Sequence, residues 1–288
     1  MLVLFTDTDT DITPAVAAEY GYHLISMPYS VEGKDVYPYE DFERFDAHAF
    51  YETLRLGVLP HTSAIAPERY KAYFEPVLQN GDDILYVHFS AAMTATFDNM
   101  AQAVRELKEQ YPDRTVYAVD TKGITLCSYA VVRAVGEKYK QGATAEELIA
   151  FAKEEAEHTA TYFFADDLRF FHRSGRVGGL AATMGSIVGV RPIICMNDEG
   201  KMVSVGKERG RANAVDRLIA TVKELGDDLS HHRVYVGNAD ADDLADEVIA
   251  RLRAETDAAD IEKVTVNPTA GSHCGPDTVG VCFHAIHR

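Results

Sequence analysis

The chain opens on the stretch LVLFTDTDTDITP, residues 2–14, in which an apolar run leads into a polar turn and a helix start. The run Leu2–Phe5 predicts a buried strand. Thr13 and Pro14 predict a helix, because threonine is a good N-cap and proline is tolerated at the first helical position. A strand, a turn and a helix in this order form the first unit of a parallel α/β sheet, and ligands bind such sheets beyond the carboxyl ends of the strands.

Three aspartates occupy the turn of this first unit, at positions 7, 9 and 11. Their spacing allows three interpretations: a pair of catalytic carboxylates, a metal site, or a polar turn that caps the next helix. The interpretation of this turn therefore largely decides which function is predicted for the chain.

The rest of the chain continues the alternation of strands and helices. Strand-like runs follow at residues 23–27, 84–89, 116–119 and 161–164, and helices are expected at 47–56, 67–79, 96–109, 126–140 and 144–158. This order predicts a mainly parallel sheet flanked by helices. After Asp166, a glycine-rich segment, closely spaced strands and two more helices predict a second α/β domain with a mixed sheet. We expect an N-terminal domain of residues 1–158 and a C-terminal domain of residues 159–288.

Composition excludes several classes of protein. The formal net charge is −17, from 45 acidic and 28 basic residues, which disfavours binding to nucleic acids and to anionic membrane surfaces. No apolar stretch reaches the length of a membrane-spanning helix, and no secretion leader precedes the first strand, so a cytoplasmic protein without stable membrane insertion is expected. The scattered cysteines form neither a disulfide framework nor a zinc site; they are Cys127, Cys195, Cys274 and Cys282.

One interpretation of the opening turn is enzymatic. An apolar strand followed by DxD resembles the start of the haloacid-dehalogenase-type phosphatases, which use one aspartate as nucleophile and a second as general acid beside magnesium. Asp7 and Asp9 would take these roles here. However, Asn238 stands where the last acidic motif requires a carboxylate, and no lysine is well placed before it. A magnesium-dependent phosphatase using Asp7 and Asp9 is therefore the alternative hypothesis.

Five stretches together resemble another family across nearly the whole chain. They are TDTDTDI (6–12), TSAIAP (62–67), HFSAAMTATF (88–97), FHRSGRV (171–177) and GSHCGP (271–276). In this order and spacing they are similar to the motifs DSxxDL, TSxPS, SSxLSGTY, LKRGGR and HTGPG of the DegV family of bacterial fatty-acid-binding proteins. Each motif is weak alone, whereas the ordered set is specific.

The resemblance implies a non-enzymatic, two-domain α/β protein that needs no cofactor or metal. It would bury one long-chain fatty acid between its domains and present the carboxylate to a fatty-acid kinase, which makes an acyl-phosphate for phospholipid synthesis. Carried over by position, the ligand-binding residues would be Thr62, Ser63, Ser90, Thr94, Arg173 and His273. The partner-binding residues would be Arg173 and Arg176, and Asp9 would have no role.

Burial of the fatty-acid tail would supply most of the affinity, at about 0.8 kcal/mol per methylene. The residues expected to line the tail pocket are Ile65, Met93, Phe97, Leu180, Met184, Ile187, Val188 and Phe283. Each proposed site residue also has a purely structural interpretation: the hydroxyls would cap helices or turns, the arginines would be solvated, and His273 would pack in the core.

The chain departs from the family pattern around the ligand head group. Ala91 and Ala95 replace a serine and a glycine of the third motif, and Cys274 and Asp277 replace a threonine and a glycine at the last one. Fewer hydroxyls remain, so a different amphiphile, such as a sterol or an isoprenoid acid, is a third hypothesis. The sequence does not give the chain length or saturation of the ligand, the identity of the kinase or the oligomeric state.

Overall fold

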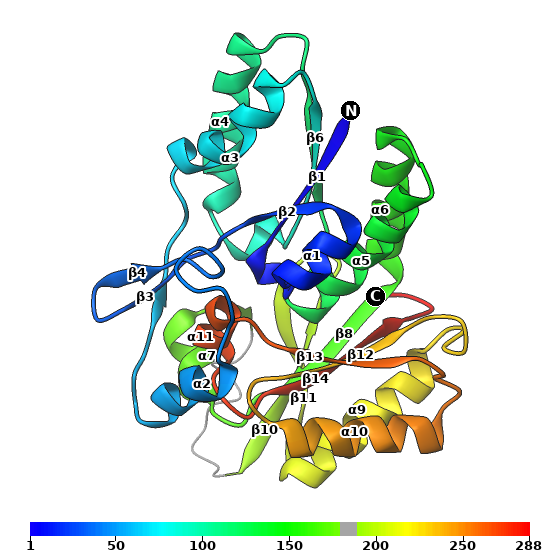
Figure 1. Cartoon of the computed structure of the whole chain (residues 1–288). Coiled ribbons are helices and arrows are strands. Elements are labelled where there is room, and N and C mark those ends of the chain that lie inside the picture. Colours follow the sequence, from blue (N-terminus) through cyan, green and yellow to red (C-terminus); the bar gives the residue numbers. More distant parts are fainter. Residues whose placement is uncertain (179–188) are drawn as a thin grey trace.

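The computed structural model describes residues 1–178 and 189–288 of the chain (Figure 1). In this part the strands form a parallel sheet, a larger mixed sheet and a small antiparallel sheet. The α/β fold with one parallel and one mixed sheet, predicted from the alternation of strands and helices, is confirmed.

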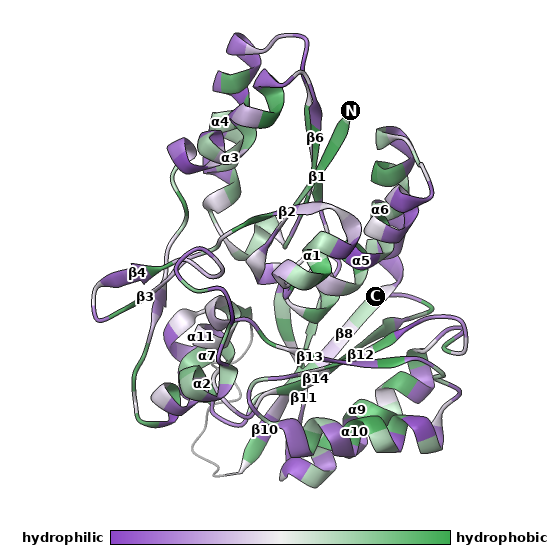
Figure 2. Ribbon diagram, in the orientation of Figure 1, coloured by the Kyte–Doolittle hydropathy of each residue, from purple (hydrophilic) through white to green (hydrophobic). Residues whose placement is uncertain are grey.

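The parallel sheet has the strand order β2-β1-β6-β7. Its strands are β1 (Leu2–Asp7), β2 (Tyr22–Ile25), β6 (Asp83–His88) and β7 (Val116–Asp120). The central strands β1 and β6 are largely buried and hydrophobic, as expected of strands covered on both faces (Figure 2). The surrounding helices are α1 (Pro14–Tyr20), α3 (Pro67–Gln79), α4 (Thr96–Gln110), α5 (Leu126–Lys140) and α6 (Ala145–His158).

The helix boundaries follow the signals in the sequence. The Thr13 hydroxyl accepts a hydrogen bond from the Val16 amide, and Gly21 ends α1 in the left-handed conformation. At the start of α6, the side chains of Thr144 and Glu147 each bond the other residue's backbone amide, which forms a capping box. The helices predicted at 67–79 and 126–140 have the predicted bounds.

The mixed sheet has the strand order β13-β12-β14-β8-β10-β11-β9. Its strands are β8 (Thr159–Phe164), β9 (Val177–Gly178), β10 (Val190–Met196), β11 (Met202–Arg209), β12 (Val234–Asn238), β13 (Ile261–Thr265) and β14 (Val279–His284). Two helices, α9 (Arg211–Leu225) and α10 (Asp242–Glu255), cover one of its faces (Figure 1).

Strand periodicity separates the two faces of this sheet. Val279, Val281 and Phe283 of β14 pack in the core beneath α9 and α10, whereas Gly280 and Cys282 point to the opposite face. The expectation that Phe283 lines a tail pocket is therefore wrong, because the cavity described below lies on the Gly280 face.

Several short elements, mostly not predicted from the sequence, gather beside the two sheets. The small antiparallel sheet consists of β3 (Tyr29–Val31), β4 (Lys34–Val36) and β5 (His61–Thr62). Near it lie α2 (Ala47–Arg55), which was predicted, α7 (Leu168–Ser174) and α11 (Pro268–Cys274) (Figure 1). Helix α11 begins with an Asn267 N-cap and Pro268, the same signal that starts α1, but seven residues without apolar periodicity do not reveal a helix.

The chain enters the mixed sheet at Thr159, directly after α6. One buried cluster nevertheless joins the two sheets, since Leu4 and Leu85 of the parallel sheet share it with Tyr235 and Cys282 of the mixed sheet. The division into domains 1–158 and 159–288 stays a prediction. All four cysteines are buried free thiols.

Among the helices that the structure describes, none has both the length and the apolar character needed to cross a membrane.

Candidate functional site

The order of the parallel sheet creates a crevice at its centre. β1 and β6 are neighbours, but the following strands β2 and β7 lie on opposite outer sides. The chain therefore leaves β1 and β6 in opposite directions, and a parallel sheet binds ligands at such a switch point, outside the carboxyl ends of its strands. Asp9 follows β1 and Phe89 follows β6, and both line a cavity of about 220 Å³. One water molecule needs only about 10–15 Å³.

The walls of the cavity are mostly apolar and come from both larger sheets. Apolar side chains that line it include Met27, Phe89, Met93, Ile124, Leu126, Phe163, Phe171, Met196, Met202 and Val266. Four of these are methionines, whose unbranched side chains adapt to flexible ligands. Where β12 and β14 pair, Gly237 and Gly280 face each other, and the side chains of Leu126 and Phe163 pack closely against them. A Cβ on Gly280 would stand 2.6 Å from the Cβ of Phe163, so glycine is required for this close packing.

A polar group of residues lies in the wall of the same cavity. Thr62 Oγ1 of β5 lies 2.9 Å from Nε2 of His273 in α11. Ser63, Thr94 and Arg176 also line the cavity. The Thr94 hydroxyl accepts a hydrogen bond from the Thr96 amide at 3.1 Å and keeps its proton free for a further acceptor. The structure thus brings together four of the six residues expected to bind the ligand, and it places Arg176, expected to contact the partner, beside the same cavity.

His273 is neutral at physiological pH. Burial, together with the nearby charges of Arg176 and Arg173, lowers the pKa of His273 to about 4. Its Nδ1 atom is shielded from solvent and has no hydrogen-bond partner among the described residues. A neutral imidazole has one N–H donor. If Thr62 donates to Nε2 of His273, the ring N–H stays free, and if Nε2 donates to Thr62, the hydroxyl proton stays free. In either case the pair offers one donor and one acceptor to a polar ligand group.

Two of the predicted ligand-binding residues are already occupied by the protein backbone. The buried Ser90 hydroxyl donates to the Gly200 carbonyl at 2.7 Å. Arg173 donates to the carbonyls of Leu59 and Pro60, at 3.0 and 2.5 Å, and to that of Ser272 at 3.3 Å. Arg173 therefore ties the segment before Thr62 to α11, whereas the exposed Arg176 borders the cavity. The ligand-binding and partner-binding roles of all these residues stay predictions.

The remaining tail-lining predictions have mixed outcomes. Met93 lines the cavity. Ile65 and Phe97 are buried in the surrounding core without belonging to its lining. Leu180, Met184, Ile187 and Val188 lie outside the described residues.

The aspartates of the opening turn have different surroundings. Asp7 accepts hydrogen bonds from the Tyr86 hydroxyl at 3.0 Å, the Phe89 amide at 3.2 Å and the Asp9 amide at 3.0 Å. Asp11 accepts from the backbone and side-chain nitrogens of Asn267, both at 2.8 Å. Burial outweighs these bonds and raises the pKa of Asp7 and of Asp11 to about 7. These two carboxyls hold the turn to β6 and to the start of α11.

The phosphatase hypothesis is not supported by this geometry. A nucleophilic aspartate needs an accessible oxygen beside a metal ion, whereas Asp7 is fully buried and both of its oxygens accept hydrogen bonds. The structural interpretation of the turn holds for Asp7 and Asp11. Asp9 differs from both, because it lines the cavity.

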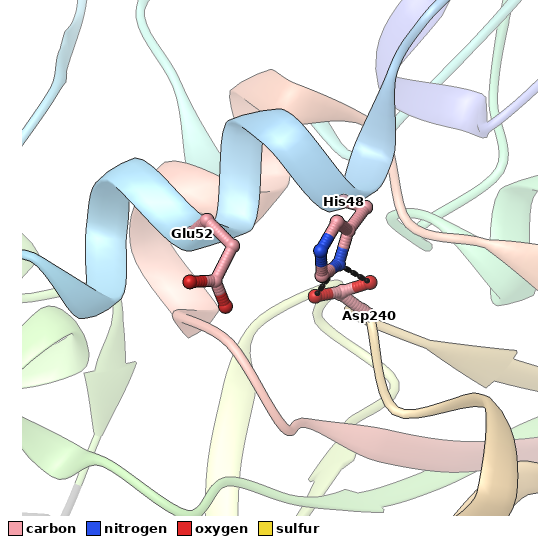
Figure 3. Close-up of side chains that lie close together, drawn as sticks. All are labelled: His48, Glu52 and Asp240. Carbon is pink, nitrogen blue, oxygen red and sulfur yellow. Dashed lines mark hydrogen bonds and ion pairs between the residues drawn. The ribbon is translucent and has the colours of Figure 1, made fainter.

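His48, Glu52 and Asp240 form another group of potential metal ligands, outside the cavity (Figure 3). His48 and Glu52 lie on α2 and face Asp240, which follows β12. Arg55 already occupies both carboxylates of this group, since its guanidinium pairs with Glu52 at 2.8 Å and with Asp240 at 2.5 Å. The group is thus an ion-pair network between α2 and the mixed sheet.

Sequence reasoning missed several lining residues. Asp9 was given no role in ligand binding, and Met27, Phe163, Met196 and Met202 were not singled out. The alternation along β8 and β10 identifies which side chains share a face, but only the packing of the two sheets shows which face borders a cavity.

Fold and site define an α/β protein in which a parallel and a mixed sheet enclose an apolar cavity with a polar group in its wall. The chain belongs to the DegV family: the family model described as "Uncharacterised protein, DegV family" matches residues 1–285. A DegV domain-containing protein of Clostridium perfringens is 26% identical, and the match covers 98% of this chain and 96% of the relative.

Solved structures share the fold. A DegV family protein of Thermus thermophilus has a TM-score of 0.86 and 21% identity, with 99% of each chain covered. A DegV protein of Thermotoga maritima has a TM-score of 0.84 and 23% identity, with 100% of this chain and 99% of the other covered. The predicted family and the DegV-like fold are confirmed.

Proposed function

We propose that the protein binds one long-chain fatty acid in the cavity, with the carboxylate at the Thr62–His273 pair, and presents that carboxylate to a fatty-acid kinase. The observation that carries this proposal is the pairing of a hydroxyl with a neutral imidazole, 2.9 Å apart, in the wall of an otherwise apolar cavity. A fatty acid has matching chemistry, since one end is polar and the rest gains about 0.8 kcal/mol per buried methylene.

The solved relatives support this ligand class. The Thermus thermophilus protein is described by its fatty-acid binding, and the Thermotoga maritima protein is a lipid-binding protein. At 21–23% identity these relatives share the fold of this chain, and we propose that it binds the same class of ligand.

The carboxylate requires compensation when it leaves water. The Thr62 hydroxyl, the Thr94 hydroxyl and the His273 ring can supply hydrogen bonds, and the exposed Arg176 adds positive charge. Thr62 lies within hydrogen-bond distance of His273, but the lowered pKa of His273 makes its imidazole a weak base for activating a hydroxyl, so the protein would deliver the acid rather than transform it. A kinase that uses ATP would act on it in the cytoplasm, which is where we place the protein.

The decisive experiment is native mass spectrometry of the purified protein, followed by denaturation and lipid analysis. The expected result is one long-chain fatty acid per chain. A protein that stays free of lipid after incubation with fatty acids would refute the proposal, and release of a sterol or an isoprenoid acid would favour the third hypothesis. Addition of a bacterial fatty-acid kinase and ATP then tests presentation, because acyl-phosphate should form only when the loaded protein is present.

A further inference from the structure

The proposed function gives no role to the side chain of Asp9. Asp9 lines the cavity wall and is only 6% exposed. Its Oδ1 atom is shielded from solvent and has no hydrogen-bond partner, and its carboxyl forms no hydrogen bond with the described residues. A buried polar group without partners is costly, so its presence in an apolar wall calls for a ligand that satisfies it.

The position of this side chain is fixed by its backbone. The Asp9 amide donates to Asp7 Oδ1 at 3.0 Å, and the Asp9 carbonyl accepts from the Thr125 amide at 2.9 Å. Thr125, the residue directly before α5, has a positive φ of 51°. The turn therefore holds the Asp9 side chain at the cavity wall by contacts on both sides of the residue.

The carboxyl group of Asp9 is suited to a neutral partner. Burial and the neighbouring carboxyls of Asp7 and Asp11 raise the pKa of Asp9 well above its usual range. The protonated group offers one O–H donor and an acceptor oxygen, which matches an alcohol better than it matches an anion.

We infer that the ligand is an oxygenated fatty acid, whose apolar chain carries a hydroxyl group that hydrogen-bonds with Asp9. This inference rests on the proposed function, because the carboxylate still occupies the Thr62–His273 pair. An unsubstituted chain would leave the Asp9 carboxyl buried without a partner. A hydroxylated chain would satisfy it and would exchange one hydrogen bond with water for one with the protein.

The test is a competition between acids of equal length. Delipidated protein is incubated with equimolar stearic acid and either 10- or 12-hydroxystearic acid, and the bound species are counted by native mass spectrometry. The wild type should favour at least one hydroxy acid about fivefold to tenfold, as expected for one added hydrogen bond. The variant Asp9→Leu should favour stearic acid instead.

Two further variants make the result specific. Asp9→Asn retains hydrogen-bonding groups of the same shape and should keep part of the preference for the hydroxy acid, which provides a second test that is independent of the leucine variant. Thr62→Val should weaken binding of both acids and leave their ratio unchanged. Equal binding of all acids by the wild type, or a ratio that Asp9→Leu does not alter, would overturn the inference but leave the proposed function standing. A wild type that binds none of the acids would overturn both.

Discussion

Thr62 and His273 are 211 residues apart in the chain and form a side-chain contact of 2.9 Å at the cavity. One lies on the two-residue strand β5 and the other near the end of the seven-residue helix α11. Neither of these short elements would be stable in isolation, so the contact depends on the packing of α2, α7 and α11 beside the two sheets.

Replacement of either partner should weaken ligand retention. For Thr62→Val and His273→Asn we expect fatty-acid affinity to fall roughly 10-fold to 100-fold, since a hydrogen bond to a charged group contributes about 1.5–3 kcal/mol. Displacement of a fluorescent fatty acid measures the change. His61→Ala is the matched control, because His61 is exposed on the same strand. Unchanged affinity in both variants would exclude this pair as the carboxylate site.

Arg173 and Arg176 should differ in their effect on stability. Arg173→Met removes three bonds to backbone carbonyls, and we expect the free energy of unfolding to fall by about 1–3 kcal/mol. Arg176→Met removes an exposed guanidinium and should change stability by less than about 0.5 kcal/mol. Urea unfolding compares the two. Equal stabilities of the two variants would show that the hydrogen bonds from Arg173 to the segment before Thr62 do not stabilise the folded protein.

Asp11 should make stability depend on pH. Its pKa is raised from 3.8 to about 7 in the folded protein, so the folded state holds the proton more firmly than the unfolded chain. The resulting stabilisation is fully present below about pH 4 and is lost as the pH rises to about 7. Relative to the non-titrating variant Asp11→Asn, the wild type should lose up to about 1.4 kcal/mol per pH unit in this window. A constant difference between pH 4 and 7 would contradict this expectation.

Asp9→Leu should stabilise the lipid-free protein. The substitution removes a buried carboxyl that has no hydrogen-bond partner among the described residues, a defect worth about 1–3 kcal/mol, and the cavity provides space for the larger side chain. The melting temperature should rise by roughly 2–6 °C. Asp257→Leu, at an exposed position, should leave it nearly unchanged. A lower melting temperature for Asp9→Leu would show that the carboxyl has a partner in the free protein.

Asp277 illustrates two opposing effects at one position. Its carboxylate pairs with Arg55 at 2.8 Å and Arg211 at 3.2 Å, but its backbone has a left-handed φ of 63°. Asp277→Gly loses two partly exposed ion pairs and relieves the backbone, so we expect a change below about 1 kcal/mol. Asp277→Ala loses the pairs without that relief and should be less stable than the glycine variant by about 1 kcal/mol. Equal stabilities for the two variants would contradict this account.

The sequence by itself determined the order of the main strands and helices. Apolar runs and capping residues such as Thr13, Pro14 and Thr144 act within a few residues of each other, so they can be recognised without tertiary structure. The ordered motifs also identified the family, and with it Thr62, Thr94 and His273 as neighbours in space.

The tertiary structure decided which groups remain free to bind. Ser90 and Arg173 have the same hydroxyl and guanidinium groups as their neighbours in the motifs, but these groups already donate hydrogen bonds to backbone carbonyls of distant segments. Asp9 alternates regularly with Asp7 and Asp11, yet it is the one carboxyl of the three that lines the cavity and has no side-chain hydrogen bond to the described residues. The physical reason is that local patterns fix the backbone conformation of each segment, whereas hydrogen-bond satisfaction and burial depend on segments that meet only when the two sheets pack together.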